Sequence, residues 1–140
     1  MDTIKLKTVS QFYDLRKYGM NPFLDDNIII PIALRVDIQN HFFKSDNHFY
    51  RFCWDNMSHY CEETGLKLRS YSACFVSHIL SRGAFPEMRW DMRNINILSL
   101  PEHQKWESHK KNEMYIYSKN IKKIQMLKDD YNTLKLWRDI

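Results

Sequence analysis

Glycine and proline are scarce in this chain, with three glycines and four prolines among 140 residues. This composition, together with the lack of an internal repeat or a low-complexity tract, excludes a collagen-like fibre, an extended linker and a solenoid. Long hydrophobic runs are lacking as well. The longest covers residues 28–34, contains a proline and is much shorter than the ~20 residues that cross a bilayer. The sequence therefore predicts one compact domain without a membrane span.

Features of export are also missing. The first nine residues carry three charged side chains and no apolar segment, so they do not resemble a signal peptide. The chain has three cysteines: Cys53, Cys61 and Cys74. An odd number of cysteines in a chain without an export signal does not predict a disulfide framework. We expect free thiols in an intracellular protein.

Positive charge is concentrated at one end of the chain. The net charge is +4, and residues 1–103 contribute none of it, with 12 Lys and Arg against 12 Asp and Glu. Residues 104–140 carry nine basic side chains against five acidic ones. A basic segment fits a polyanionic partner such as nucleic acid. A lysine-rich helix face exposed to water is the alternative explanation.

The first half of the chain predicts a mixture of helix and strand. Apolar spacing predicts a short helix within residues 4–18, with Thr8 as a candidate cap. Turn-forming residues make 19–27 a loop, and the β-rich run over 28–36 predicts a buried strand. Residues 37–56 fit either type of element. Their aromatic side chains predict core packing rather than a platform for stacking bases.

The second half predicts two strands followed by helices. Residues 69–79 and 94–100 alternate as strands do, and Pro101 is typical of a first helical turn. The helical pattern then continues, with a break near 108–112. Its apolar stripe consists of Met114, Tyr117, Ile121, Ile124, Leu127, Tyr131, Leu134 and Trp137. The stripe packs either across the domain or against a second copy in a homodimer.

Three side chains with catalytic chemistry coincide with the strand, strand, helix order. His78 ends the first strand, Asn94 opens the second, and His103 lies in the first turn of the helix, nine positions after Asn94. With this order and spacing, residues 76–107 resemble the HNH family of nucleases, and more narrowly the small HNH proteins of phage and prophage genomes. The resemblance covers about a quarter of the chain.

The resemblance implies an α+β fold. A ββα-metal core would occupy about residues 69–110, after an aromatic-rich N-terminal α/β extension and before a long C-terminal helix over about 112–138. It also implies an intracellular setting, in the cytoplasm of a bacterium or of a phage-infected host cell. The partner would be DNA, and no membrane is involved.

The same resemblance implies a metal-dependent endonuclease that hydrolyses DNA phosphodiester bonds. His78 would be the general base, since neutral imidazole accepts a proton from water near pH 7. Asn94 would orient that imidazole through a carbonyl or help to hold the metal, and His103 would be a metal ligand. The cofactor would be a divalent ion, Mg²⁺ or Mn²⁺ before others. The basic side chains expected to contact phosphate are Arg82, Arg89, Arg93, Lys105, Lys110 and Lys111.

Two places depart from the family pattern. Ser77 stands where many members have a metal-binding Asp, and a neutral hydroxyl is a weak ligand for Mg²⁺ or Mn²⁺. Cys61-x-x-Thr64 and Ser99-x-x-Glu102 stand where many relatives have two C-x-x-C pairs that bind zinc. One thiolate of four remains, so we expect no structural zinc.

These departures keep two other functions open. One is a catalytically inactive HNH-fold module that binds DNA or protein. The other is an interaction protein that dimerises or docks on a partner through the long C-terminal helix. Retention of His78, Asn94 and His103 favours the enzyme, because a module without catalytic duty has no chemical need for all three.

Overall fold

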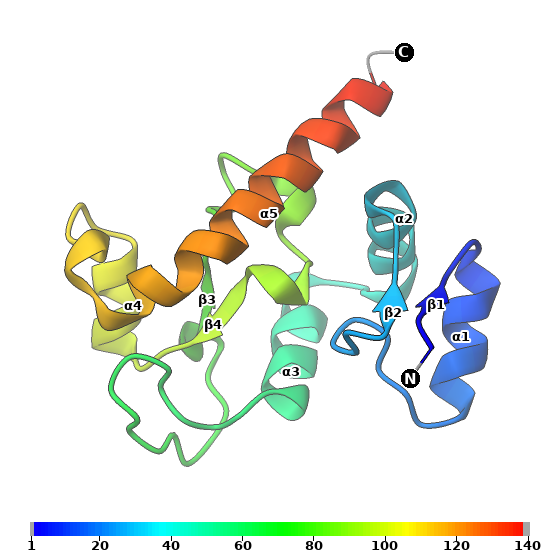
Figure 1. Cartoon of the computed structure of the whole chain (residues 1–140). Coiled ribbons are helices and arrows are strands. Elements are labelled where there is room, and N and C mark those ends of the chain that lie inside the picture. The colour runs from blue at the N-terminus through cyan, green and yellow to red at the C-terminus, as the bar shows by residue number, and fades with distance from the viewer. Residues whose placement is uncertain (1, 139–140) are drawn as a thin grey trace.

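The computed structural model describes residues 2–138, in which five α-helices accompany two small two-stranded sheets (Figure 1). The elements are β1 (Ile4–Lys5), α1 (Val9–Lys17), β2 (Ile28–Ile29), α2 (Ile32–Phe42), α3 (Asp46–Asn56), β3 (Val76–His78), β4 (Ile95–Ile97), α4 (Leu100–Trp106) and α5 (Tyr115–Arg138). Single 3₁₀ turns are η1 (Ala73–Phe75), η2 (Pro86–Met88), η3 (Met92–Asn94) and η4 (Lys111–Glu113). The α+β class expected from the sequence is confirmed.

The N-terminal helix forms where the sequence predicts it. The Thr8 side chain accepts the backbone N–H of Gln11, and the Gln11 side chain accepts the backbone N–H of Thr8, so a capping box closes the start of α1. The predicted strand over 28–36 is wrong beyond Ile29. Pro31 directly precedes α2, because proline has no N–H for a strand ladder. Ile32 and Val36 of the apolar run lie on the buried face of that helix.

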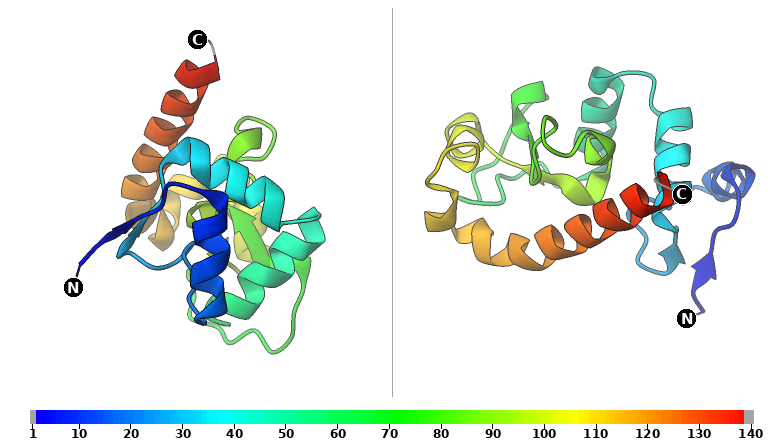
Figure 2. Two further views of the ribbon diagram at one scale, coloured as in Figure 1. Left: turned by 90° about the vertical axis from the view of Figure 1, so that its right-hand side faces the viewer. Right: turned by 90° about the horizontal axis from the view of Figure 1, so that it is seen from above.

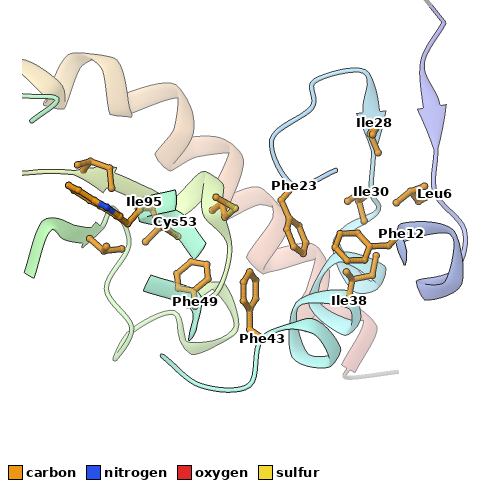
Figure 3. Close-up of a cluster of buried hydrophobic side chains, with 14 of the residues drawn as sticks. Leu6, Phe12, Phe23, Ile28, Ile30, Ile38, Phe43, Phe49, Cys53 and Ile95 are labelled. Carbon is orange, nitrogen blue, oxygen red and sulfur yellow. The ribbon is translucent and has the colours of Figure 1, made fainter. Parts of the chain in front are cut away.

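Aromatic side chains form the core of the N-terminal half, as the sequence predicts (Figure 3). Phe23 stacks on Phe43 with ring centroids 5.6 Å apart, and Phe43 meets Phe49 edge to face at 4.9 Å. The same cluster continues into the hairpin through Val76 and Ile95. The N-terminal extension therefore supports β3, which ends at His78, and β4, which directly follows Asn94.

The second half has the predicted order of strand, strand and helix. β3 and β4 pair antiparallel, with His78 opposite Ile95. Both strands are shorter than predicted: η1 directly precedes β3, Asn94 belongs to η3, and Leu100 already belongs to α4. The predicted break in the helical segment is confirmed and lies between α4 and α5.

Helix α5 runs along one side of the molecule, from the region of α4 to α2 (Figures 1 and 2). Of the predicted stripe, Met114, Leu127 and Leu134 are buried within the chain, which agrees with packing across the domain. Ile121 is an exception, with 51% of its surface exposed. Its neighbour Asn120 is buried instead, through hydrogen bonds to β4. The Trp137 side chain lies outside the described residues.

None of the helices described within residues 2–138 combines the length and the apolar character that a bilayer span requires.

The packing of α5 predicts unequal effects of two leucine truncations on that helix. Leu127 is fully buried and Leu136 is 67% exposed. We expect Leu127→Ala to lower the free energy of unfolding by about 2–5 kcal/mol and the matched control Leu136→Ala to change it by less than about 0.5 kcal/mol. Urea unfolding of the two variants measures the difference. Equal losses would contradict the described packing of α5.

Candidate functional site

His78, at the end of β3, has one ring nitrogen committed and one available. Its Nε2 lies 2.8 Å from the backbone oxygen of Arg89. A carbonyl only accepts, so Nε2 carries the proton and Nδ1 keeps its lone pair. No hydrogen bond to Nδ1 from any residue in the described range is present. This is the tautomer that a general base needs.

The surroundings of His78 favour its neutral form. The Phe49 ring stacks beside it and the Tyr50 ring meets it edge-on, with centroids 6.4 and 6.0 Å away. Burial lowers the pKa of His78, and the positive charges of Arg82 and His103 lower it further against the opposing effect of the Arg89 carbonyl. At pH 7 the imidazole is therefore ready to accept a proton.

Asn94 acts on the loop between the strands rather than on the imidazole. Its side chain is fully buried, with the oxygen accepting the Leu80 N–H at 2.7 Å. Its amide nitrogen donates to the carbonyls of Leu80 and Met88 at 3.0 and 3.1 Å. A direct role in metal binding does not match this geometry, whereas orientation of His78 through a carbonyl, as expected from the sequence, is compatible with it. The carbonyl on His78 belongs to Arg89, which directly follows Met88.

His103, on α4, faces a carboxylate of the same helix. Its Nδ1 donates to the Cys74 carbonyl at 2.5 Å, and its Nε2 lies 2.8 Å from Glu107 Oε1. A neutral imidazole with its proton on Nδ1 presents a lone pair to that carboxylate, so the contact is favourable only with a proton or a cation present. Two ligands of one six-coordinate ion at ~2.1 Å are themselves about 3 Å apart. His103 and Glu107 thus fit a divalent ion that takes its other ligands from water and phosphate.

Ser77 does not contribute a ligand atom to the pair formed by His103 and Glu107. Its side chain is completely buried and its Oγ has no hydrogen-bond partner. It pairs across the sheet with Asn96, whose side chain bonds to Asn120 of α5, so Ser77 lies on the face of the hairpin that α5 covers. Ser77, a weak candidate ligand already by its neutral hydroxyl, is therefore not placed to hold a metal beside His103. Within residues 2–138, no three His, Cys, Asp or Glu side chains gather as a ready-made metal site.

A cleft of about 520 Å³ opens beside His78. We call it the His78 cleft. Its polar lining combines the imidazole with one carboxylate and three cations: His78, Glu107, Arg82, Lys111 and Lys128. Phe85 and Trp106 form part of its apolar wall. A phosphate group entering the cleft would meet a base, cations and the Glu107 end of the His103 pair.

Two of these residues were missed by the sequence reasoning. Glu107 lies four positions after His103 on the same helix, and that spacing was a signal that could have identified it. Lys128 lies on α5 and reaches the cleft only through the packing of that helix. No local pattern around Lys128 marks it.

The predicted phosphate-binding side chains divide into two groups. Arg82 and Lys111 line the cleft, although Arg82 also pairs with Asp46 at 3.1 Å, and Lys105 and Lys110 are exposed. Arg93 is instead structural, because the carboxylates of Asp91 and Asp130 hold it at 2.7 and 3.0 Å.

Arg89 is also engaged within its own loop. Its guanidinium lies over the Trp90 ring and donates to the Pro86 carbonyl. Its backbone oxygen, rather than its charge, is the group that reaches His78.

The positions expected to correspond to a zinc site contact each other directly. The Cys61 thiol donates to Ser99 Oγ at 3.7 Å. Burial raises the pKa of this thiol, but hydrogen bonds from Thr64 and from nearby backbone bring it below its usual value. The carboxylates of the next two residues bind backbone N–H groups. Glu62 accepts the Ile97 N–H, and Glu63 accepts the N–H of Ile116.

No family model, curated protein or solved structure matches this chain.

The burial of His78 predicts a measurable titration. Its pKa in the folded protein lies below the ordinary 6.5, so an NMR titration should show its ring resonances changing at lower pH than a free histidine. A His78→Gln variant assigns the signal. Below about pH 6.5, unfolded chains take up a proton that folded His78 does not, so this residue makes stability fall as the pH falls. A midpoint at or above 6.5 would contradict the described environment.

Proposed function

We propose that the protein is a metal-dependent endonuclease of the HNH type that hydrolyses phosphodiester bonds of DNA. The observation that carries the proposal is His78, which lines a cleft together with Glu107 and three cations and has Nε2, but not Nδ1, hydrogen-bonded within the described residues. The order of β3, β4 and α4, with His78, Asn94 and His103 at the expected places, supports a ββα-metal core.

The reaction begins with a water molecule beside His78 Nδ1. The imidazole takes one proton as the water oxygen attacks phosphorus, and the bond from phosphorus to the 3′ oxygen breaks. The resulting imidazolium still donates from Nε2 to the Arg89 carbonyl, which stabilises its charge. The released 3′ oxygen takes a proton from solvent, and deprotonation of His78 restores the enzyme.

Phosphate is positioned by the cations of the cleft. Arg82, Lys111 and Lys128 come from the loop between the strands, from η4 and from α5. Three elements that are distant in sequence therefore present positive charge to one phosphate group. Such contacts bind the backbone of DNA without reading its bases.

A divalent ion would be held by His103 Nε2 and Glu107, next to the cleft. Its expected chemistry is neutralisation of negative charge on the phosphate and the leaving oxygen. The Cys74 carbonyl supports the pair by fixing the proton of His103 on Nδ1, which leaves Nε2 as the ligand atom. Mg²⁺ and Mn²⁺ remain the ions to test first.

Plasmid nicking is the direct test of catalysis. We expect nicking with Mg²⁺ or Mn²⁺ and none with EDTA. His78→Ala should reduce the rate by about 10²–10⁴-fold, because it removes the base, while DNA affinity in a gel shift is retained. His103→Ala and Glu107→Gln should raise the metal concentration needed for half-maximal nicking. DNA binding with no nicking by the wild-type protein would instead establish an inactive binding module.

The position of Lys128 predicts how DNA affinity responds to salt. Lys128→Ala should weaken binding and reduce the slope of log affinity against log salt by about one. Lys122→Ala is the matched control, since Lys122 is exposed on the same helix and does not line the cleft. Equal slopes for Lys128→Ala and the wild type would show that DNA does not lie in the His78 cleft.

A further inference from the structure

A second cavity lies away from the His78 cleft and shares none of its lining residues. Its volume is about 420 Å³, within the size range of small-molecule sites. The loop before β2, helix α2, the η3–β4 segment and helix α5 all contribute to its wall. We call it the Arg35 cavity.

Arg35 is the unusual feature of this wall. Its side chain is 5% exposed, and its Nε and Nη1 have no hydrogen-bond partner. Gln39 lies one turn further along α2, is 1% exposed, and its Nε2 also has no partner. Residues four apart share one face of a helix. Buried donors without an acceptor cost free energy, so this face of α2 lacks an acceptor.

The neighbouring carboxylates do not supply that acceptor. The charge of Asp91 acts on Arg35, yet the hydrogen bonds of Asp91 go to Arg93. Asp130 also pairs with Arg93. The cluster thus contains two guanidinium groups, Arg35 and Arg93, and both nearby carboxylates pair with Arg93. The four charges balance, so what Arg35 lacks is a hydrogen-bond acceptor, which the acid group of a ligand would supply.

The rest of the wall defines what kind of anion fits. Leu24, Met57 and Met126 provide accessible apolar surface, and exposed Lys123 adds a cation. Asp25 and Asp26 also line the cavity and oppose a highly charged ligand such as a polyphosphate. A ligand with an apolar body and a single acid group satisfies both conditions.

We propose that the Arg35 cavity binds a small organic anion, with its acid group paired to the Arg35 guanidinium and its apolar body against Leu24, Met57 and Met126. The acid is a carboxylate or a phosphate, since a guanidinium pairs with either. This site does not depend on the proposed nuclease activity.

Titration of the full chain with matched probes tests the proposal. Benzoate and phenyl phosphate share a ring and differ in the acid group, whereas benzamide lacks the charge and inorganic phosphate lacks the ring. We expect benzoate or phenyl phosphate to bind at millimolar concentration or below in a calorimetric titration, and to raise the unfolding temperature. Benzamide and inorganic phosphate should bind at least about tenfold more weakly. The preference between benzoate and phenyl phosphate shows whether the cavity selects a carboxylate or a phosphate.

Three variants locate the binding. Arg35→Met should abolish it. Lys123→Ala, which changes an exposed side chain and leaves the core intact, should weaken it by up to about fivefold. Lys128→Ala, in the His78 cleft, should leave it unchanged. No binding of either ring-bearing anion, or binding that Lys128→Ala removes while Lys123→Ala preserves it, would overturn the proposal.

Discussion

The side-chain amide of Asn94 is the constraint on which the candidate site depends. It accepts the Leu80 N–H and donates to the carbonyls of Leu80 and Met88, so it joins the two ends of the loop between β3 and β4. An amide supplies both an acceptor and two donors, which a carboxylate or an alkyl group of this size does not. The position of the Arg89 carbonyl follows from this loop, and that carbonyl decides which nitrogen of His78 has a free lone pair.

The hairpin receives further support from both sides. On one side, the aromatic cluster of the N-terminal half reaches Ile95 and stacks Phe49 on His78. On the other, Asn96 and Asn120 join β4 to α5. The Glu63 carboxylate accepts an N–H at the start of α5, where the helix dipole favours negative charge. Packing and carboxylates thus fix the segments around Cys61 and Ser99.

Local patterns predicted the parts of the structure that depend on near neighbours. The capping residue Thr8, the break before α5 and the placement of His78 and His103 on successive elements all followed from spacing in the sequence. The segment 28–36 was predicted wrongly, because a short apolar run fits a strand or a helix equally well. Lys128 and the pairing of Arg93 with Asp130 depend on where α5 packs. Contacts between residues so far apart leave no periodic signal.

The two histidines of the site lie beside different kinds of partner. His78 lies beside a carbonyl and two aromatic rings, where burial lowers its pKa and keeps it neutral. His103 lies beside the Glu107 carboxylate, where a proton or a metal ion on Nε2 stabilises the pair. In the proposed reaction, the lowered pKa of His78 keeps the base unprotonated to lower pH than an ordinary histidine. The proposed activity therefore depends on two different settings: burial that keeps His78 neutral, and a carboxylate beside His103 that suits a cation.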